Sequence, residues 1–259
     1  SQVRLTKTVI ARIPYLNCAP FFEGLPLDDA WELADLSPRQ LGREAASGRI
    51  AAGPMSLVDY LRLQEAFERI TNLGVAVRGR SGSALLFSQK PIRQLEDATI
   101  AVTDETSTTA LLLRLILEVR YERLPRAYQR GVPTEDVDAC LLIGDEALTF
   151  RATNRRFPYE TDLAFEWWLW QHLPFVFAVW AIRKETSLAK KQRLTRALFK
   201  AVSVNAGRLD ILAQQRAETL GMPVDDLHTY LANFIYRLSD PEEEGIKRFE
   251  ALAHDHRLL

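Results

Sequence analysis

Small uncharged polar side chains recur where predicted strands of this chain end. Asn17 and the thiol of Cys18 lie between Pro14 and Pro20 in the segment IPYLNCAPFF, directly after a short apolar run. Two prolines this close together do not fit the interior of a helix or of a central strand, so the segment is predicted to be a loop. In open α/β sheets, ligands bind beside loops that leave the carboxyl ends of strands. This loop is therefore either part of a binding site or an ordinary strand-to-helix turn.

Hydroxyl groups occupy the corresponding place in three later segments. They are Ser56 in GPMSLVDYL, Ser81 and Ser83 in RGRSGSALLF, and Thr106, Ser107, Thr108 and Thr109 in TDETSTTALLL. A helix start has free backbone N–H groups and the positive end of the helix dipole, so it binds carboxylates and phosphates readily. The last cluster is either such a site or a simple set of helix caps. Together the loops predict a pocket for a small, oxygen-rich, anionic molecule.

A further strand end carries a charge. The run LLIGDEAL places Gly144 and Asp145 where an apolar strand stops and a helix begins. Asp145 is expected to cap this helix, to contact a ligand, or to do both.

Common catalytic signatures are missing from the chain. It contains no GxSxG, P-loop, HExxH, CxxC or GxGxxG pattern. The histidines all lie late in the sequence, outside the strand-end loops: His172, His228, His254 and His256. Cys18 has no histidine in a neighbouring loop to activate it. We therefore expect neither a metal site nor any other cofactor.

Composition excludes several classes of protein. The chain has 259 residues, 47% of them apolar and 26% charged, with a net charge of -1. There is no overall positive charge for binding nucleic acid or anionic lipid, and no apolar run as long as the roughly 18–20 residues of a membrane span. One disulfide between Cys18 and Cys140 is arithmetically possible, but reduced thiols are expected in a cytoplasmic protein. No signal-peptide core is evident before the first prolines, so a cytoplasmic protein is predicted.

The elements that position these loops follow from hydrophobic patterning. Ser37-Pro38 predicts a helix start, and Gly53-Pro54 is expected to end a strand. Strands are predicted at 9–11, 31–36, 49–52, 70–77, 84–87, 99–102, 139–143, 157–163 and 174–183. After residue 187 the pattern changes to helices at 187–206, 209–220, 225–234 and 241–254, with a short strand at 235–238. These elements predict two α/β lobes with a helical C-terminus.

The predicted lobes form a clamshell. The chain is expected to cross from one lobe to the other near residues 87–90 and to return near residues 175–180. Lobe 1 then comprises residues 1–88 and 180–259, and lobe 2 comprises residues 89–179, with the ligand cleft between them.

Six motifs carry a family resemblance. IPYLNCAPFFEGL, GPMSLVDYL, SALLFSQKPI, TDETSTTALLL, LLIGDEAL and LPFVFAVWAIR occur in this order over residues 12–183. The set resembles the chorismate dehydratases, a menaquinone-biosynthesis family with a periplasmic-binding-protein-like fold. The resemblance implies a type II clamshell of mixed sheets flanked by helices. Phe22 and Glu23 depart from the family pattern, in which an aromatic pair or Tyr-Gly is more common at this place.

The resemblance also implies an activity and a site. The activity is that of a cytoplasmic carbon–oxygen lyase of the futalosine route, which converts chorismate to 3-[(1-carboxyvinyl)oxy]benzoate and water without a cofactor. Asn17 and Ser83 are the implied catalytic residues. The expected substrate-binding residues are Ser56, Thr106, Ser107, Thr108, Gly144 and Asp145.

None of the loop hydroxyls or amides is a strong base at neutral pH. Our hypothesis is that the enolpyruvyl carboxylate of chorismate itself takes the proton, that Asn17 positions it, and that Ser83 contacts the substrate. Asp145 is the rival base. Two other functions stay open: a non-catalytic small-anion binding protein, and the sister enzyme that forms dihydroxynaphthoate, whose histidine base has no counterpart in a matching loop here. The oligomeric state is not predicted.

Overall fold

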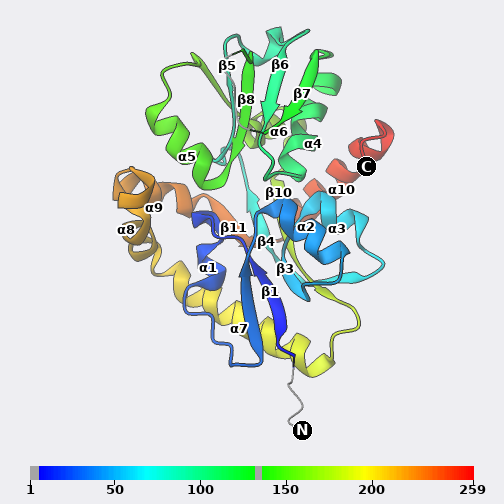
Figure 1. The fold of residues 1–259 in the computed structure, drawn as a ribbon, viewed down its shortest axis with the longest axis vertical. Coiled ribbons are helices and arrows are strands. Elements are labelled where there is room, and N and C mark those ends of the chain that lie inside the picture. The colour runs from blue at the N-terminus through cyan, green and yellow to red at the C-terminus, as the bar shows by residue number, and fades with distance from the viewer. Residues whose placement is uncertain (1–5, 132–135) are drawn as a thin grey trace.

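The structure is a computed structural model that describes residues 6–131 and 136–259. It contains a six-stranded sheet in the order β11-β4-β10-β3-β1-β2 and a five-stranded sheet in the order β7-β6-β8-β5-β9. We call the six-stranded sheet with its helices lobe 1 and the five-stranded sheet with its helices lobe 2. Figure 1 shows lobe 2 above lobe 1, with the C-terminal helices running around lobe 1.

Both sheets are mixed. In lobe 1, β1 (Thr8–Arg12) runs parallel to β2 (Trp31–Asp35) and β3 (Ala52–Ser56). β10 (Phe175–Arg183) is antiparallel to β3 and to β4 (Phe67–Val77), and β11 (Phe234–Arg237) is antiparallel to β4. In lobe 2, β6 (Thr99–Val102) runs parallel to β7 (Ala127–Arg130) and β8 (Ala139–Ile143). There β5 (Ala84–Ser88) is antiparallel to β8 and to β9 (Tyr159–Asp162).

Helices follow most strand ends, as the patterning predicts. Lobe 1 carries α1 (Ala19–Phe22), α2 (Pro38–Ala46), α3 (Leu57–Arg62), α7 (Leu188–Ala206), α8 (Leu209–Leu220), α9 (Val224–Ala232) and α10 (Asp240–Asp255). Lobe 2 carries α4 (Thr108–Arg114), which continues as a π-helix over Leu115–Arg120, α5 (Gly144–Thr153) and α6 (Leu163–Gln171). The predicted cap of α2 is confirmed, because Ser37 and Gln40 form a capping box.

The prediction that Gly53-Pro54 ends a strand is wrong. Both residues lie inside β3, opposite Ala181 and Trp180 of β10. β3 pairs with β1 only at Ala52, so beyond that residue it is paired on one side, where a proline is tolerated as in an edge strand. Gly53 allows close packing, because an added Cβ would lie 3.0 Å from Cβ of Ala11.

The predicted crossing points between the lobes are also corrected. β4 ends in lobe 1 at Val77 and β5 begins in lobe 2 at Ala84, so the chain crosses at residues 78–83 rather than 87–90. β10 belongs to lobe 1 from Phe175, so the return lies before residue 175. The first crossing turns at Gly79 and Gly82, whose positive φ angles of 96° and 74° favour glycine.

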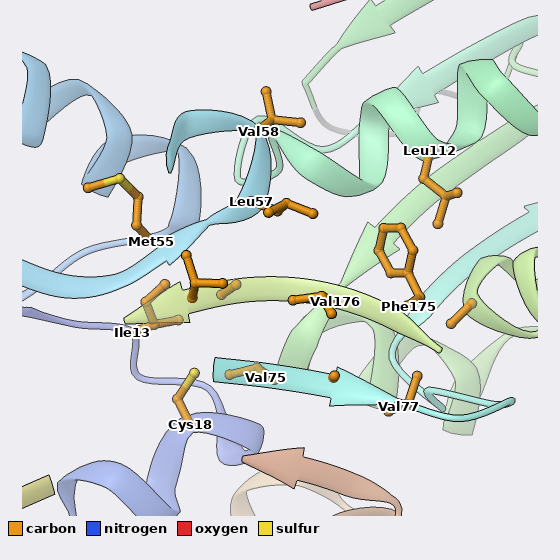
Figure 2. Packing of buried hydrophobic residues seen from close by; sticks show 14 of the residues in the cluster. Ile13, Cys18, Met55, Leu57, Val58, Val75, Val77, Leu112, Phe175 and Val176 are labelled. Carbon is orange, nitrogen blue, oxygen red and sulfur yellow. The ribbon is translucent and has the colours of Figure 1, made fainter. Parts of the chain in front are cut away.

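A hydrophobic core spans the two lobes. One cluster of buried residues contains Val75 and Phe175 of lobe 1 together with Leu112 and Leu141 of lobe 2. Figure 2 shows Leu112 of α4 pointing toward Phe175 of β10. Both cysteines are buried free thiols. Within the described ranges no helix is both long and apolar enough to cross a membrane.

Candidate active site

A cavity lies where the strand-end loops of both lobes meet. Its volume is about 70 Å³, which is smaller than the range of about 300–1,000 Å³ that is usual for small-molecule sites. Seven of the eight predicted site residues line it: Asn17, Ser56, Ser83, Thr106, Ser107, Thr108 and Gly144. Asp145, the eighth, does not. The rest of the lining consists mainly of apolar residues, among them Ile13, Pro54, Val75, Ile143 and Phe177.

The cavity is neutral. Among the described residues that line it there is no charged side chain. A bound anion would therefore depend on amide, hydroxyl and backbone N–H donors. Such donors stabilise negative charge strongly where water is excluded.

Asn17 lies in a tight one-turn helix over Leu16–Cys18, immediately before α1. The hydroxyl of Tyr236 donates to the backbone oxygen of Asn17 at 2.6 Å. The backbone N–H of Leu16 donates to Oδ1 of Asp145 at 2.8 Å. The Asn17 loop is thus held by β11 on one side and by lobe 2 on the other.

Ser83 lies at the end of the first crossing and bonds to a residue from the far end of the chain. Its Oγ is 2.6 Å from the hydroxyl of Tyr230 in α9. Tyr230 is only 6% exposed, and burial raises the pKa of its hydroxyl well above the ordinary value of 10.0.

The sequence reasoning missed Tyr230 and Tyr236. α9 shows a buried face in which Tyr230 follows Leu227 and precedes Leu231, and this spacing predicts burial. Nothing local indicates that the Tyr230 hydroxyl reaches Ser83.

The hydroxyls of Ser56 and Thr108 connect the two lobes. Ser56 Oγ and Thr108 Oγ1 are 2.6 Å apart, and the backbone N–H of Val58 donates to Thr108 Oγ1 at 3.0 Å. Ser56 precedes α3, but its side chain does not cap that helix.

The other hydroxyls before α4 differ in their roles. Thr106 Oγ1 accepts from the backbone N–H of Ala110 at 3.3 Å, which is a capping interaction. Ser107 has no such bond to its helix. Its side chain lies near Asp59, whose pKa is raised by burial, and the neighbouring Ser107 hydroxyl acts in the opposite direction.

Asp145 occupies a structural position at the first turn of α5. Besides accepting from Leu16, it forms an ion pair with Arg216 of α8, and Arg216 also donates to the backbone oxygen of Pro14 at 2.9 Å. Burial raises the pKa of Asp145, whereas the Leu16 N–H and the Arg216 guanidinium lower it. Its side chain does not cap α5, contrary to expectation.

The backbone angle at residue 144 and the close approach of Tyr15 both favour glycine there. Its φ angle is 59°, and an added Cβ would lie 2.6 Å from Cδ2 of Tyr15. The Tyr15 hydroxyl in turn donates to Glu105 of lobe 2 at 2.9 Å.

Cys18 lines the cavity but is not an activated nucleophile. Burial raises the pKa of its thiol to about 12. A thiol that stays protonated at neutral pH is unreactive without a neighbouring base.

The two lobes and the cavity between them define a protein of the periplasmic-binding-protein fold. Protein AF1704 from Archaeoglobus fulgidus has a similar structure, with a TM-score of 0.79 at 18% identity over 98% of each chain. The aliphatic sulphonate binding protein SsuA from Escherichia coli has a TM-score of 0.66 at 12% identity, over 99% of this chain and 89% of its own. SsuA from Xanthomonas axonopodis pv. citri, bound to MOPS, also has a TM-score of 0.66, at 15% identity over 100% of this chain and 96% of its own. These likenesses confirm the predicted fold class.

Sequence similarity identifies the family to which the chain belongs. The model of a family described as menaquinone biosynthesis matches residues 8–255. Chorismate dehydratase from Thermus thermophilus is 34% identical over 258 aligned residues, covering 92% of this chain and 92% of the relative. The chain belongs to the menaquinone biosynthesis family, and the resemblance to chorismate dehydratases is confirmed.

Proposed function

We propose that this protein is a chorismate dehydratase that acts in the cytoplasm and eliminates water from chorismate to give 3-[(1-carboxyvinyl)oxy]benzoate. The similarity to a chorismate dehydratase over nearly the whole chain supports this activity. The observation that carries it is the neutral cavity between the lobes, which gathers Asn17, Ser83 and the hydroxyls before α4.

The reaction needs little chemistry from the protein. A ring C–H bond breaks, and its electron pair completes an aromatic ring as the neighbouring hydroxyl leaves. The proton and the departing hydroxide together form the released water. Because aromaticity is gained, much of the driving force lies in the substrate.

In the proposed mechanism, the enolpyruvyl carboxylate of the substrate accepts the ring proton. Asn17 positions this carboxylate, and Ser83 contacts the substrate. The backbone N–H groups at the start of α4, with Ser107 and Thr108, suit the other carboxylate. Closure of the lobes orients the substrate and excludes water.

Because the described residues that line the cavity include no carboxylate, the cavity favours a proton acceptor that belongs to the substrate. Asp145 is the nearest rival, but its two oxygens already engage Leu16 and Arg216. A general base must come within hydrogen-bonding reach of the proton that it removes. We therefore assign Asp145 to holding the Asn17 loop rather than to proton transfer.

The alternative of a non-catalytic binding protein is favoured by the structural likeness to SsuA, which is named as a binding protein. Incubation with chorismate separates the two functions. The dehydratase converts chorismate into an aromatic product that is lighter by one water, seen by ultraviolet absorbance and mass spectrometry. A binding protein retains chorismate unchanged, and that result would refute the proposed activity.

A further inference from the structure

The hydroxyl of Tyr230 bonds to Ser83, one of the two proposed catalytic residues, but Tyr230 does not line the cavity. The phenolic oxygen is 2.6 Å from Ser83 Oγ. Ser83 belongs to the crossing between the lobes, whereas Tyr230 belongs to α9. One hydrogen bond therefore joins two segments that are 147 residues apart in the sequence.

The ring of Tyr230 is fixed from two sides. Its ring meets that of Phe234 edge to face, with the centroids 5.1 Å apart. On the other side is Gly82, where an added Cβ would lie 3.1 Å from Cδ2 of Tyr230. Glycine at residue 82 thus makes room for the ring beside the crossing segment and fixes the place of the hydroxyl.

Either hydroxyl can donate in the bond between Ser83 and Tyr230. Burial raises the pKa of Tyr230 well above its ordinary value, so the phenol stays neutral and keeps its proton at working pH. If Tyr230 donates to Ser83, the Ser83 hydroxyl keeps its own proton for the substrate.

We propose that Tyr230 is a positioning residue whose hydroxyl holds the side chain of Ser83 in one orientation. The inference rests on the proposed function, because Tyr230 acts through a residue assigned to that reaction. Without the phenolic hydroxyl, the Ser83 hydroxyl loses its buried partner and can rotate.

The test compares Tyr230→Phe with the wild-type protein. We expect kcat for chorismate to fall about 10- to 100-fold, as when a group that orients a reacting residue is lost, while KM changes less than about threefold. Tyr230→Met also lacks the hydroxyl and fills the space with a flexible apolar chain, so it should show the same loss. Tyr128→Phe is the matched control, since it removes a tyrosine hydroxyl bonded to Glu118 in lobe 2, away from the cavity. All four proteins are assayed well below the melting temperature of the least stable one.

A double-mutant cycle with Ser83→Ala separates positioning from general packing. If Tyr230 acts through Ser83, adding Tyr230→Phe to Ser83→Ala costs less in kcat than Tyr230→Phe costs alone. A kcat within twofold of wild type for Tyr230→Phe, or fully additive losses, would overturn the inference.

Crystal structures of both proteins provide a readout that needs no turnover. We expect a single conformer of Ser83 in the wild type and altered or multiple conformers in Tyr230→Phe. Unchanged conformers overturn the inference whether or not chorismate is the substrate. Failure of the wild type to convert chorismate counts against the proposed function, and the positioning role is then decided by these conformers alone.

Discussion

At the scale of single residues, two residues expected to face a ligand also join the lobes. Thr108 Oγ1 accepts a hydrogen bond from the backbone N–H of Val58, and the Thr108 hydroxyl also bonds to that of Ser56. Both Thr108 and Ser56 line the cavity. The same hydroxyls therefore face the cavity and link the two lobes.

Replacing Thr108 with valine tests this link. The substitution keeps the shape of the side chain but leaves the Val58 N–H and the Ser56 hydroxyl without a buried partner. We expect the free energy of unfolding in urea to fall by about 1–3 kcal/mol. Thr153→Val, at an exposed position in α5, should change it by less than about 0.5 kcal/mol. Equal effects of the two substitutions would argue against a stabilising role for Thr108.

The buried thiols predict a dependence on pH. Burial raises the pKa of both Cys18 and Cys140 to about 12, from an ordinary value of 9.0. The unfolded chain therefore releases these protons first as pH rises. Their contribution to the free energy of unfolding is complete below pH 9 and is lost as pH rises toward 12.

Thiol labelling at pH 8 checks the same feature, because the reagents attack the thiolate. The native protein should stay unlabelled over the time in which the urea-unfolded chain reacts fully. Rapid labelling of Cys18 in the native protein would show that its thiol is ionised and accessible.

At the scale of secondary-structure elements, glycine determines how closely α5 approaches the Asn17 loop. Gly144→Ala would place a methyl group 2.6 Å from a ring carbon of Tyr15. Gly221, which follows α8, has a similar φ of 64° but no atom within 4 Å of an added Cβ. The two positions therefore separate backbone strain from steric contact.

We expect both alanine substitutions to cost about 1–2 kcal/mol in backbone strain. Gly144→Ala alone should also displace Tyr15 and the loop that follows, lowering kcat/KM for chorismate by at least about tenfold. Steady-state kinetics and thermal melting of the two variants measure the difference. Full activity in Gly144→Ala would show that the loop tolerates the contact.

Most elements could be predicted because their signals are local. Ser37-Pro38 begins a helix as its residue types suggest, and the buried strand before Gly144 follows from its continuous apolar run. The errors arose where tertiary pairing outweighs local signals. Gly53-Pro54 stays in a strand because β10 pairs with it.

At the scale of the whole molecule, the C-terminal helices complete the site. Tyr230 bonds to Ser83 and Tyr236 bonds to Asn17, and α8 lies beside α5 of lobe 2 (Figure 1). The sequence predicted the cavity-lining loops but not these contacts. A separation of about 150–220 residues along the chain leaves no periodic or motif signal to detect.

The ion pair between Arg216 and Asp145 joins the C-terminal helices to lobe 2. Arg216→Gln should weaken this closure and raise KM for chorismate about fivefold, equivalent to about 1 kcal/mol for a partly exposed ion pair, with little change in kcat. Arg208→Gln, at an exposed position just before the same helix, is the control and should behave as wild type. A large fall in kcat with unchanged KM would indicate a direct role of Arg216 in the chemistry.

The most direct measurement compares Asn17→Ala and Asp145→Ala in kcat at saturating chorismate. If the substrate carboxylate is the base, Asn17→Ala should lower kcat by about 10²–10³-fold, as for loss of a hydrogen-bond donor at a reacting group. Asp145→Ala should raise KM and keep kcat within about tenfold of wild type, because Asp145 holds the loop and does not take the proton. Loss of all turnover in Asp145→Ala, with folding and chorismate binding intact, would contradict the substrate-assisted mechanism and identify Asp145 as the base.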